Sequence, residues 1–302
     1  MNIGWIGVGN IGLPMARHVI KAGHKLTIHD LQQDAAKPLL EMGASWADSP
    51  VEAAKENELV IMSLPMPKDV KEVCFGTNRL IKGLQPGNIC IDLSTNSLEM
   101  VRQIEHEFKK HDIEFLDAPV SGGVEGANSK DLVVLVGGSE NAFTKVKGIL
   151  DLIGEKVNFC GPIGTGTICK LSHQLLSMAI LQIGAEILTL GVKAGVDLDI
   201  LADSVSKGAL GKVPPLGRFY QDVFTGNLEG TKSSFFLGLA AKDVKLANEM
   251  GRQVGVPLVV GNVVEQLLIE TMNRGWQLKN FPAIVQLQEE KSGVSLRTDN
   301  FS

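Results

Sequence analysis

The sequence has few of the features that mark secreted, metal-binding or disulfide-bonded proteins. Its four cysteines are scattered and form no Cys-x-x-Cys pair, so we expect buried thiols in a reducing cytoplasm, without disulfides. The six histidines form no His-x-x-x-His or Glu-flanked zinc pattern, and we therefore expect no metal. No basic segment or cleavable apolar stretch precedes the first apolar run at residue 2, which argues against a secretion signal.

Charge and hydropathy exclude two further classes of partner. The net charge of −5 is not concentrated in a run, and no basic patch contains interleaved aromatics, so neither nucleic acid nor an acidic membrane surface is expected to bind. The longest apolar stretch, residues 175–192, is interrupted by Gln182 and Glu186, which predicts a buried helix and not a membrane span. With 302 residues, 44% apolar and 21% charged, the chain is typical of a cytoplasmic globular protein of two domains.

The N-terminus contains the most informative pattern. Residues 2–6 form a short apolar run that leads into Gly-x-Gly-x-x-Gly, and an apolar helical pattern follows. In a dinucleotide site, the glycine at position 7 permits a tight turn, Gly9 lets the backbone approach a pyrophosphate, and Gly12 lets the helix pack against the strand. The unpaired N–H groups of the helix start would face the phosphates. A tight turn without a ligand is the alternative explanation.

A second apolar run, residues 25–29, ends in Asp30, about twenty residues beyond the glycines, where an acid accepts hydrogen bonds from a ribose. A carboxylate repels a 2′-phosphate, and no arginine follows in residues 31–34, so the pattern favours NAD over NADP. A solvated acid at a strand end is the simpler alternative.

The remaining pattern divides the chain into two domains. Short apolar runs alternate with helical patterns up to about residue 160, which predicts an α/β Rossmann-type, doubly wound and mostly parallel sheet. The predicted strands after the first two are residues 59–63, 88–92, 114–117, 132–136 and 156–159.

Beyond the glycine-rich residues 161–166 the predicted strands stop. Residues 167–193 are apolar nearly all round, which predicts a long interdomain helix buried against other elements. Further helical patterns cover residues 197–206, 238–253 and 257–273. We therefore expect a dinucleotide-binding domain at 1–162 and an all-helical domain at 163–302.

Three loops after predicted strands are candidates for ligand binding, because ligands of open α/β sheets lie at the carboxyl ends of the strands. Leu64 and Pro65 follow the first of these strands, and the hydroxyls of Ser94 and Thr95 follow the second. The loop at residues 118–123 offers a hydroxyl and glycine N–H groups, which suit a carboxylate. Ordinary turns rich in Ser, Thr and Gly have the same composition.

Lys170 is the candidate for proton transfer. It lies near the start of the long helix and so near the predicted domain boundary, where ligand sites often form. A desolvated lysine has a lowered pKa and acts as an acid or base. His173 and Gln174 lie three and four residues later on the same helix face. A solvated surface lysine is the alternative.

Together these motifs closely resemble the β-hydroxyacid dehydrogenase family, which includes 3-hydroxyisobutyrate dehydrogenases and tartronate semialdehyde reductases. The similarity extends over nearly the whole chain and rests on residues 6–16, 92–95, 117–123, 164–170 and 242–247. It implies an NAD-dependent dehydrogenase or reductase in which Lys170 is the catalytic lysine. It also implies that Ser121, Gly122 and Gly123 bind the carboxylate of a small substrate, and that the helical domain supports dimers or tetramers.

The resemblance also implies cofactor contacts. Asn10 and Ile11 would join the glycines of the turn, Leu64 and Pro65 would line the cofactor path, and Thr95 would contact the nicotinamide side. Lys242 would reach from the helical domain to close over the cofactor.

The chain departs from the family pattern at three positions. Gln174 replaces the usual asparagine four residues after the lysine, and the extra methylene moves its amide by about 1.5 Å toward or away from a substrate. His173 stands where a second asparagine is common. Asp69 falls where a neutral asparagine often contacts the cofactor, so we leave it out of the expected site. The sequence thus predicts the reaction class and not the substrate. A non-catalytic dinucleotide-binding protein and an enzyme for a sugar acid or an imine remain alternatives.

Overall fold

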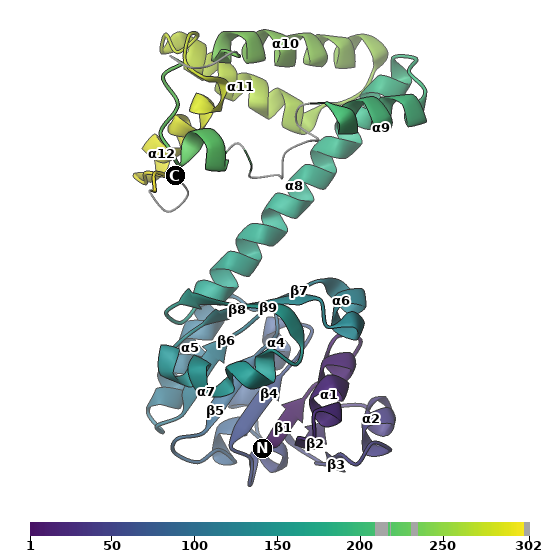
Figure 1. Ribbon diagram of the computed structural model, residues 1–302, viewed down its shortest axis with the longest axis vertical. Helices are drawn as coiled ribbons and strands as arrows, with labels where there is room; N and C mark the ends of the chain where they lie inside the picture. The colour runs from purple at the N-terminus through teal and green to yellow at the C-terminus, as the bar shows by residue number, and fades with distance from the viewer. Residues whose placement is uncertain (209–216, 218, 231–234, 299–302) are drawn as a thin grey trace. The chain divides into compact units, whose positions relative to one another are not determined.

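The computed structural model describes residues 1–208, 217, 219–230 and 235–298 (Figure 1). The chain forms two compact units, Met1–Leu175 and Leu176–Ser302, called here the N-terminal and C-terminal units. The boundary between them falls within one long helix, α8 (Thr165–Lys193).

A nine-stranded sheet is the centre of the N-terminal unit. Its order is β3-β2-β1-β4-β5-β6-β8-β7, with β9 paired to β8. All pairs from β3 to β6 and the β8–β9 pair are parallel, whereas β8 pairs antiparallel with β6 and β7. The predicted doubly wound, mostly parallel sheet is confirmed. The strands are β1 (Asn2–Ile6), β2 (Lys25–His29), β3 (Ser45–Trp46), β4 (Leu59–Met62), β5 (Ile89–Asp92), β6 (Glu114–Asp117), β7 (Val120–Ser121), β8 (Leu132–Gly137) and β9 (Gly154–Gly161).

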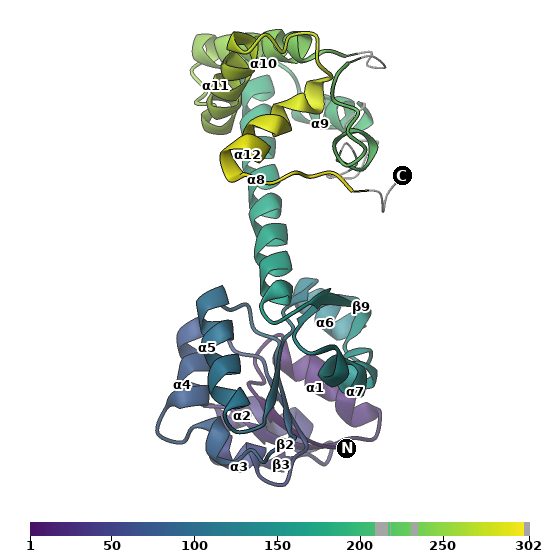
Figure 2. The ribbon, with the colours of Figure 1, turned by 90° about the vertical axis from the view of Figure 1, so that its left-hand side faces the viewer.

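Alternation along the strands builds two cores, one on each face of the sheet. In β1, Ile3 and Trp5 contribute to one core and Ile6 to the other, as the period of two requires. Helices α1, α2, α6 and α7 pack on the first face, and α3, α4 and α5 pack on the second. Figure 2 shows α1, α6 and α7 on one side of the sheet and α4 and α5 on the other. These helices are α1 (Gly12–Lys21), α2 (Gln33–Leu40), α3 (Pro50–Ala54), α4 (Pro67–Phe75), α5 (Leu98–Lys109), α6 (Gly123–Ser129) and α7 (Glu140–Leu150), and η1 (Leu80–Lys82) is a short 3₁₀ turn.

The C-terminal unit is built from helices around a separate small core, as predicted. Among its described residues, the β pairing is limited to one isolated bridge between Phe236 and Asn280. Its core includes Val223, Leu237 and Leu268. The elements are α9 (Leu198–Lys207), the π-helical turn η2 (Phe219–Val223), α10 (Leu237–Val254), α11 (Val259–Asn273), the 3₁₀ turn η3 (Phe281–Ile284) and α12 (Val285–Ser292).

The prediction that the long helix is buried is wrong for this chain. On α8, Leu175 is 74% exposed, Met178 54% and Leu181 65%. Among the described helices, α8 is also the one that is long and apolar enough to cross a membrane, by length and composition only. The all-round apolar pattern indicates that the helix needs cover, whereas these side chains are exposed among the residues that the structure describes.

Candidate functional site

Four parallel strands end together at one edge of the sheet in the N-terminal unit. Ile6 of β1 pairs with Met62 of β4, Met62 with Asp92 of β5, and Asp92 with Asp117 of β6. The loops that leave these strands therefore start side by side. Because ligands of open α/β sheets bind at this edge, the candidate site is built from these loops.

A cavity of about 820 Å³ lies at the β1, β2 and β4 part of this edge. Eight predicted cofactor residues line it: Gly7, Gly9, Asn10, Ile11, Gly12, Asp30, Leu64 and Pro65. The cavity has the volume of a typical cofactor or small-molecule site. Its mixture of glycine backbone, apolar side chains and acidic side chains suits a dinucleotide. The residues present therefore fit an NAD-type cofactor.

The three glycines of the turn are required for different reasons. A Cβ on Gly12 would overlap the carbonyl oxygen of Gly7, and a Cβ on Gly7, which has a φ of +90°, would overlap the carbonyl oxygen of Ser63. A Cβ on Gly9 would meet no protein atom within 4 Å, although Gly9 lines the cavity. Gly7 and Gly12 are thus needed by the fold, whereas Gly9 leaves space beside the backbone for a ligand.

Asp30 lies at the end of β2 with its carboxylate held by two backbone N–H groups. Its Oδ2 accepts from Val8 at 2.8 Å and its Oδ1 accepts from Gln32 at 2.9 Å. Each carboxylate oxygen has a further lone pair, so Asp30 retains capacity to accept from a ribose hydroxyl. The two backbone bonds fix the orientation of the carboxylate and therefore the direction of its remaining lone pairs.

Asp92, at the end of β5, organises the next loop. Its carboxylate is 1% exposed and accepts from the Ser94 N–H at 2.9 Å and from Asn96 Nδ2 at 3.1 Å. Ser94 Oγ in turn accepts from the Leu64 N–H at 2.8 Å, which joins this loop to the cavity wall. Burial raises the pKa of Asp92 to about 6. Thr95, between these residues, is exposed and does not line the cavity.

Asp117, at the end of β6, bonds to the start of α8. Its two carboxylate oxygens accept from the Gly164 N–H and the Thr167 N–H, each at 2.7 Å. These donors are among those that a helix start leaves without intrahelical partners. The carboxylate is 1% exposed, and burial raises its pKa.

Lys170 lies one turn beyond this anchored helix start. Its side chain is half-buried, and burial lowers the pKa of its amine below the ordinary value. His173 and Gln174 follow on the same helix and are exposed. The arrangement places an amine of reduced basicity on the element that Asp117 ties to the sheet edge.

The loop after Asp117 contains the predicted carboxylate site. Ser121 ends β7 and is partly exposed, while Gly122 and Gly123 are exposed with φ values of +140° and +66°. These values are rarely adopted by other residues, so the glycines let the backbone turn here without side chains over its N–H groups. Val120 and Ser121 pair with β8, which makes this segment an extension of the sheet and not only the loop that was predicted.

Lys242 belongs to the C-terminal unit. It is exposed on α10, and its amine lies 3.1 Å from the Asp243 carboxylate.

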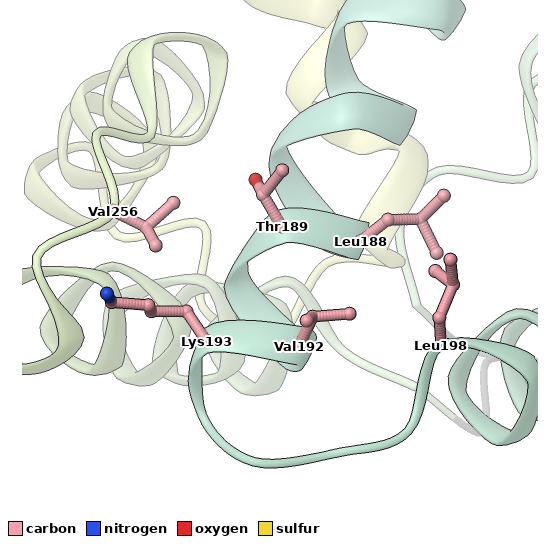
Figure 3. A pocket seen from close by; sticks show the side chains of 6 residues that line it. All are labelled: Leu188, Thr189, Val192, Lys193, Leu198 and Val256. Atoms are coloured by element: carbon pink, nitrogen blue, oxygen red, sulfur yellow. The ribbon is translucent and has the colours of Figure 1, made fainter.

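A second, smaller cavity of about 480 Å³ lies within the C-terminal unit (Figure 3). Thr189 and Lys193 are the polar residues among the six that line it, and both come from α8. The other described residues of its lining are apolar, and no Asp, Glu, His or Cys is among them. The lining residues are Leu188, Thr189, Val192, Lys193, Leu198 and Val256.

The cysteines are free, and two of them depart from the expected burial. Cys74 and Cys90 are buried, whereas Cys160 is partly exposed and Cys169 is exposed. Within the described ranges, no group of three or more His, Cys, Asp or Glu side chains is arranged to hold a metal ion.

Several residues that line the larger cavity have no signature in the sequence. Asp48 and Ser49 precede α3, Glu72 lies on α4, and Asn78 follows it. Asp69, which the sequence analysis left out, also lines the cavity. Asp69 and Glu72 belong to α4 on the second face, whereas Asp48, Ser49 and Asn78 lie in the segments before α3 and after α4. No motif in the sequence marks these positions.

Two family profiles match the chain. Residues 2–161 match the NAD-binding domain of 6-phosphogluconate dehydrogenase, and residues 164–288 match a domain described as NAD-binding of NADP-dependent 3-hydroxyisobutyrate dehydrogenase. The chain is 33% identical over 302 residues to mitochondrial 3-hydroxyisobutyrate dehydrogenase of Rattus norvegicus, a match that covers 96% of this chain and 88% of the relative.

Solved structures have the same fold. The 3-hydroxyisobutyrate dehydrogenase of Mycobacterium tuberculosis, described with L-serine, is 27% identical with a TM-score of 0.64, and the match covers 95% of this chain and 98% of that one. A Myxococcus stipitatus imine reductase variant in complex with NAD⁺ has a TM-score of 0.83 at 18% identity, with 95% and 99% covered. At that identity the second likeness shows the fold alone.

Proposed function

Because the chain belongs to the β-hydroxyacid dehydrogenase family of NAD(P)-dependent oxidoreductases that act on CH–OH groups, we propose that it interconverts a small β-hydroxyacid and the matching semialdehyde or keto acid. The observation that carries the proposal is the common edge formed by the ends of β1, β4, β5 and β6. The glycine turn, the Ser121 loop and, through Asp117, the Lys170 helix all start from that edge. The division of the family profiles near residue 162 supports a cofactor domain at 1–162 and a helical domain at 163–302.

Lys170 would transfer the proton of the reaction. When bound, the nicotinamide of the cofactor accepts or donates the hydride. The Lys170 amine would take the proton from the substrate hydroxyl in oxidation and return it to the carbonyl oxygen in reduction. The lowered pKa of its amine favours this role, because a general acid or base works best with a pKa near the working pH.

Substrate orientation would come from the neighbouring loop. Ser121, Gly122 and Gly123 would hold the substrate carboxylate through a hydroxyl and backbone N–H groups, which are suitable donors for an anion. Thr95 would contact the nicotinamide side, Gln174 would bind the substrate, and Lys242 would close over the cofactor. The role of Gln174 follows from its position four residues after Lys170 on one helix face.

A pair of substitutions tests the role of Lys170. Lys170→Ala should lower kcat by about 10²- to 10⁴-fold, the usual contribution of a general acid or base. Lys170→Arg should also be poorly active, because arginine keeps the positive charge but does not release its proton. NADH affinity, measured by fluorescence titration, should be retained in both variants, since Lys170 does not line the cavity. Wild-type turnover in Lys170→Ala would refute this mechanism.

We propose that NAD is preferred over NADP. Four acids line the cavity, Asp30, Asp48, Asp69 and Glu72, and no lysine or arginine is among the described residues of its lining. A 2′-phosphate would meet repulsion here without a cationic partner. The value of kcat/KM should therefore be higher with NAD than with NADP. Asp30→Ser should reduce the difference between the two cofactors. Equal efficiency with both cofactors in the wild type would contradict the role of Asp30.

The substrate is to be found among short hydroxyacids. A screen of NAD reduction with 3-hydroxyisobutyrate, glycerate, serine, threonate and 3-hydroxypropionate should give one clearly preferred compound. Gln174→Asn should change the order of preference, because misplacement of a contacting group by about 1 Å can alter the rate by about a hundredfold. Tight NADH binding without turnover on the whole panel would instead favour the non-catalytic binder.

We propose a cytoplasmic homodimer or homotetramer. The exposed apolar side chains of α8, including Leu175, Met178 and Leu181, support this because a soluble chain needs to cover them. Light scattering coupled to size-exclusion chromatography should give a mass of two or four chains. Leu181→Lys should shift the equilibrium toward the single chain, and a monodisperse wild-type monomer would contradict the proposal.

A further inference from the structure

We propose that Asp117 is the positioning residue for Lys170: its carboxylate fixes the first turn of α8 against the end of β6 and thereby sets where the lysine amine meets the substrate. The inference deepens the proposed function and rests on it for its catalytic part. Asp117 touches neither cofactor nor substrate in this scheme, so its role is indirect. All the residues involved belong to the N-terminal unit.

The anchoring contact is double and short. Asp117 Oδ1 accepts from Gly164 and Oδ2 from Thr167, both at 2.7 Å, so the two oxygens hold two points of the same turn. Short bonds to an ionised acceptor are about twice as strong as neutral ones. Thr167 lies three residues before Lys170 and shares its helix face, so a shift of this turn is passed directly to the lysine.

The surrounding backbone leaves the turn little freedom. A Cβ on Gly166 would overlap the carbonyl oxygen of Leu135, and a Cβ on Gly137 would overlap Asp117 Oδ1. Two glycines thus let α8, β8 and the carboxylate come into direct contact. Because interiors at this density do not deform continuously, loss of the carboxylate should displace the turn and not merely loosen it.

The same residue also lies at the start of the loop that contains Ser121, because Asp117 ends β6 and Ala118 begins that loop. The backbone of this segment is held on both sides, because the Ala118 N–H donates to the Asp92 carbonyl at 2.8 Å and the Leu135 N–H donates to the Pro119 carbonyl at 3.1 Å. One side chain therefore joins the start of the loop that would hold the substrate to the helix that carries the proposed proton donor.

The adjacent strand provides a matched control. Asp92 pairs in register with Asp117 and is equally buried, but its carboxylate bonds to Ser94 and Asn96 and not to α8. Asp92→Asn and Asp117→Asn are therefore the same chemical change at neighbouring strand ends. If Asp117 acts by positioning α8, only the second should disturb residues 164–170.

The first measurement needs no cofactor and no substrate. Amide hydrogen exchange in the segment 161–169 of the cofactor-free protein should be about tenfold or more faster in Asp117→Asn than in the wild type, because an amide can accept only one of the two bonds. In Asp92→Asn this segment should exchange as in the wild type, because the Asp92 carboxylate bonds to Ser94 and Asn96 and not to α8. Unchanged exchange at 161–169 in Asp117→Asn would overturn the inference.

The second measurement separates positioning from stability. With active sites counted by NADH titration, Asp117→Asn should lower kcat per site by about 10- to 100-fold, the range expected for misplacement of about 1 Å or less, with NADH affinity retained. Ser139→Ala, which removes the side-chain cap of α7, should lower the melting temperature and leave kcat per site unchanged. Wild-type kcat per site in a folded Asp117→Asn would mean a merely structural residue.

A second variant of the anchor covers the case in which Asp117→Asn does not fold. Asp117→Glu keeps the charge and both acceptor oxygens but displaces them from the helix start by one methylene, about 1.5 Å. It should also lower kcat per site, and wild-type kcat per site would again refute the inference. A wild-type enzyme without turnover on any hydroxyacid would refute the proposed function, whereas the exchange data would still decide the anchoring contact on their own.

Discussion

Asp92 should make the stability of the N-terminal unit fall as the pH rises from about 4 to about 6. Burial raises the pKa of this carboxyl from 3.8 to about 6, despite the bonds it accepts from Ser94 and Asn96. In the unfolded chain the carboxyl loses its proton near pH 3.8, and in the folded chain it does so near pH 6. Between these values the folded state binds more protons, so the free energy of unfolding decreases with rising pH.

The interval from 3.8 to about 6 corresponds to about 3 kcal/mol at 1.36 kcal/mol for each tenfold change in proton affinity. Asp92→Asn cannot ionise and lacks this dependence. The difference in unfolding free energy between variant and wild type should therefore move in favour of the variant by about 2.4 kcal/mol between pH 4 and pH 7, because at pH 4 part of the unfolded carboxyl is already ionised. The lost hydrogen bond from Asn96 adds an offset that is the same at each pH and does not affect the slope.

Urea unfolding at pH 4, 5, 6 and 7 measures this difference. Trp5 and Trp46 lie in the N-terminal unit, and a Trp276→Phe background restricts the tryptophan fluorescence to them. Asp112→Asn is the matched control, because Asp112 is exposed and asparagine tolerates its positive φ of 54°. The slope of the Asp92→Asn difference with pH is compared with the slope for Asp112→Asn. Equal slopes for the two variants would refute the assignment of a burial-raised pKa to Asp92.

Three further substitutions have expected outcomes. Gly9→Ala should weaken NADH binding by about tenfold, or 1.4 kcal/mol, in a fluorescence titration without lowering stability, since its Cβ meets no protein atom. Gly12→Ala should lower the free energy of urea unfolding by about 1–3 kcal/mol, because its Cβ overlaps the Gly7 carbonyl. Glu186→Gln should destabilise the C-terminal unit by about 1–3 kcal/mol in the same assay, since the buried carboxylate accepts from two N–H groups at the start of α11. Wild-type affinity in the first variant, or wild-type stability in the others, would contradict these contacts.

Sequence periodicity was sufficient for most of the fold. The seven predicted strands and four predicted helices begin and end within two residues of the observed ones, because apolar alternation and glycine punctuation mark these elements strongly. β3 and β7 were not predicted, since each has two residues and is defined by its pairing with β2 or β8. A segment of that length contains no period, so its strand character comes from its neighbours.

The residues of the candidate site were likewise predictable only in part. Residues next to strand ends, such as Gly9, Asp30 and Pro65, were predicted, because the edge of a parallel sheet is a local consequence of strand order. Asp48 reaches the cavity from the segment before α3 and Glu72 from α4, and both helices pack on the second face. Their positions depend on how those helices pack, which no spacing in the sequence expresses. The anchoring bonds of Asp117 likewise join residues 47 and 50 positions apart.

The predicted burial of α8 was wrong for a physical reason, and the same reason supports the proposed oligomer. An apolar pattern all round a helix indicates that its side chains need to be covered. The pattern does not indicate which element, or which copy of the chain, covers them. Leu175, Met178 and Leu181 recur at intervals of three and lie on neighbouring positions of one helix side, and all are more than half exposed. An apolar pattern on side chains that stay exposed in the described part of the chain is what a surface between copies of the chain requires. The same residues that made the burial prediction wrong are therefore the strongest argument for an oligomer.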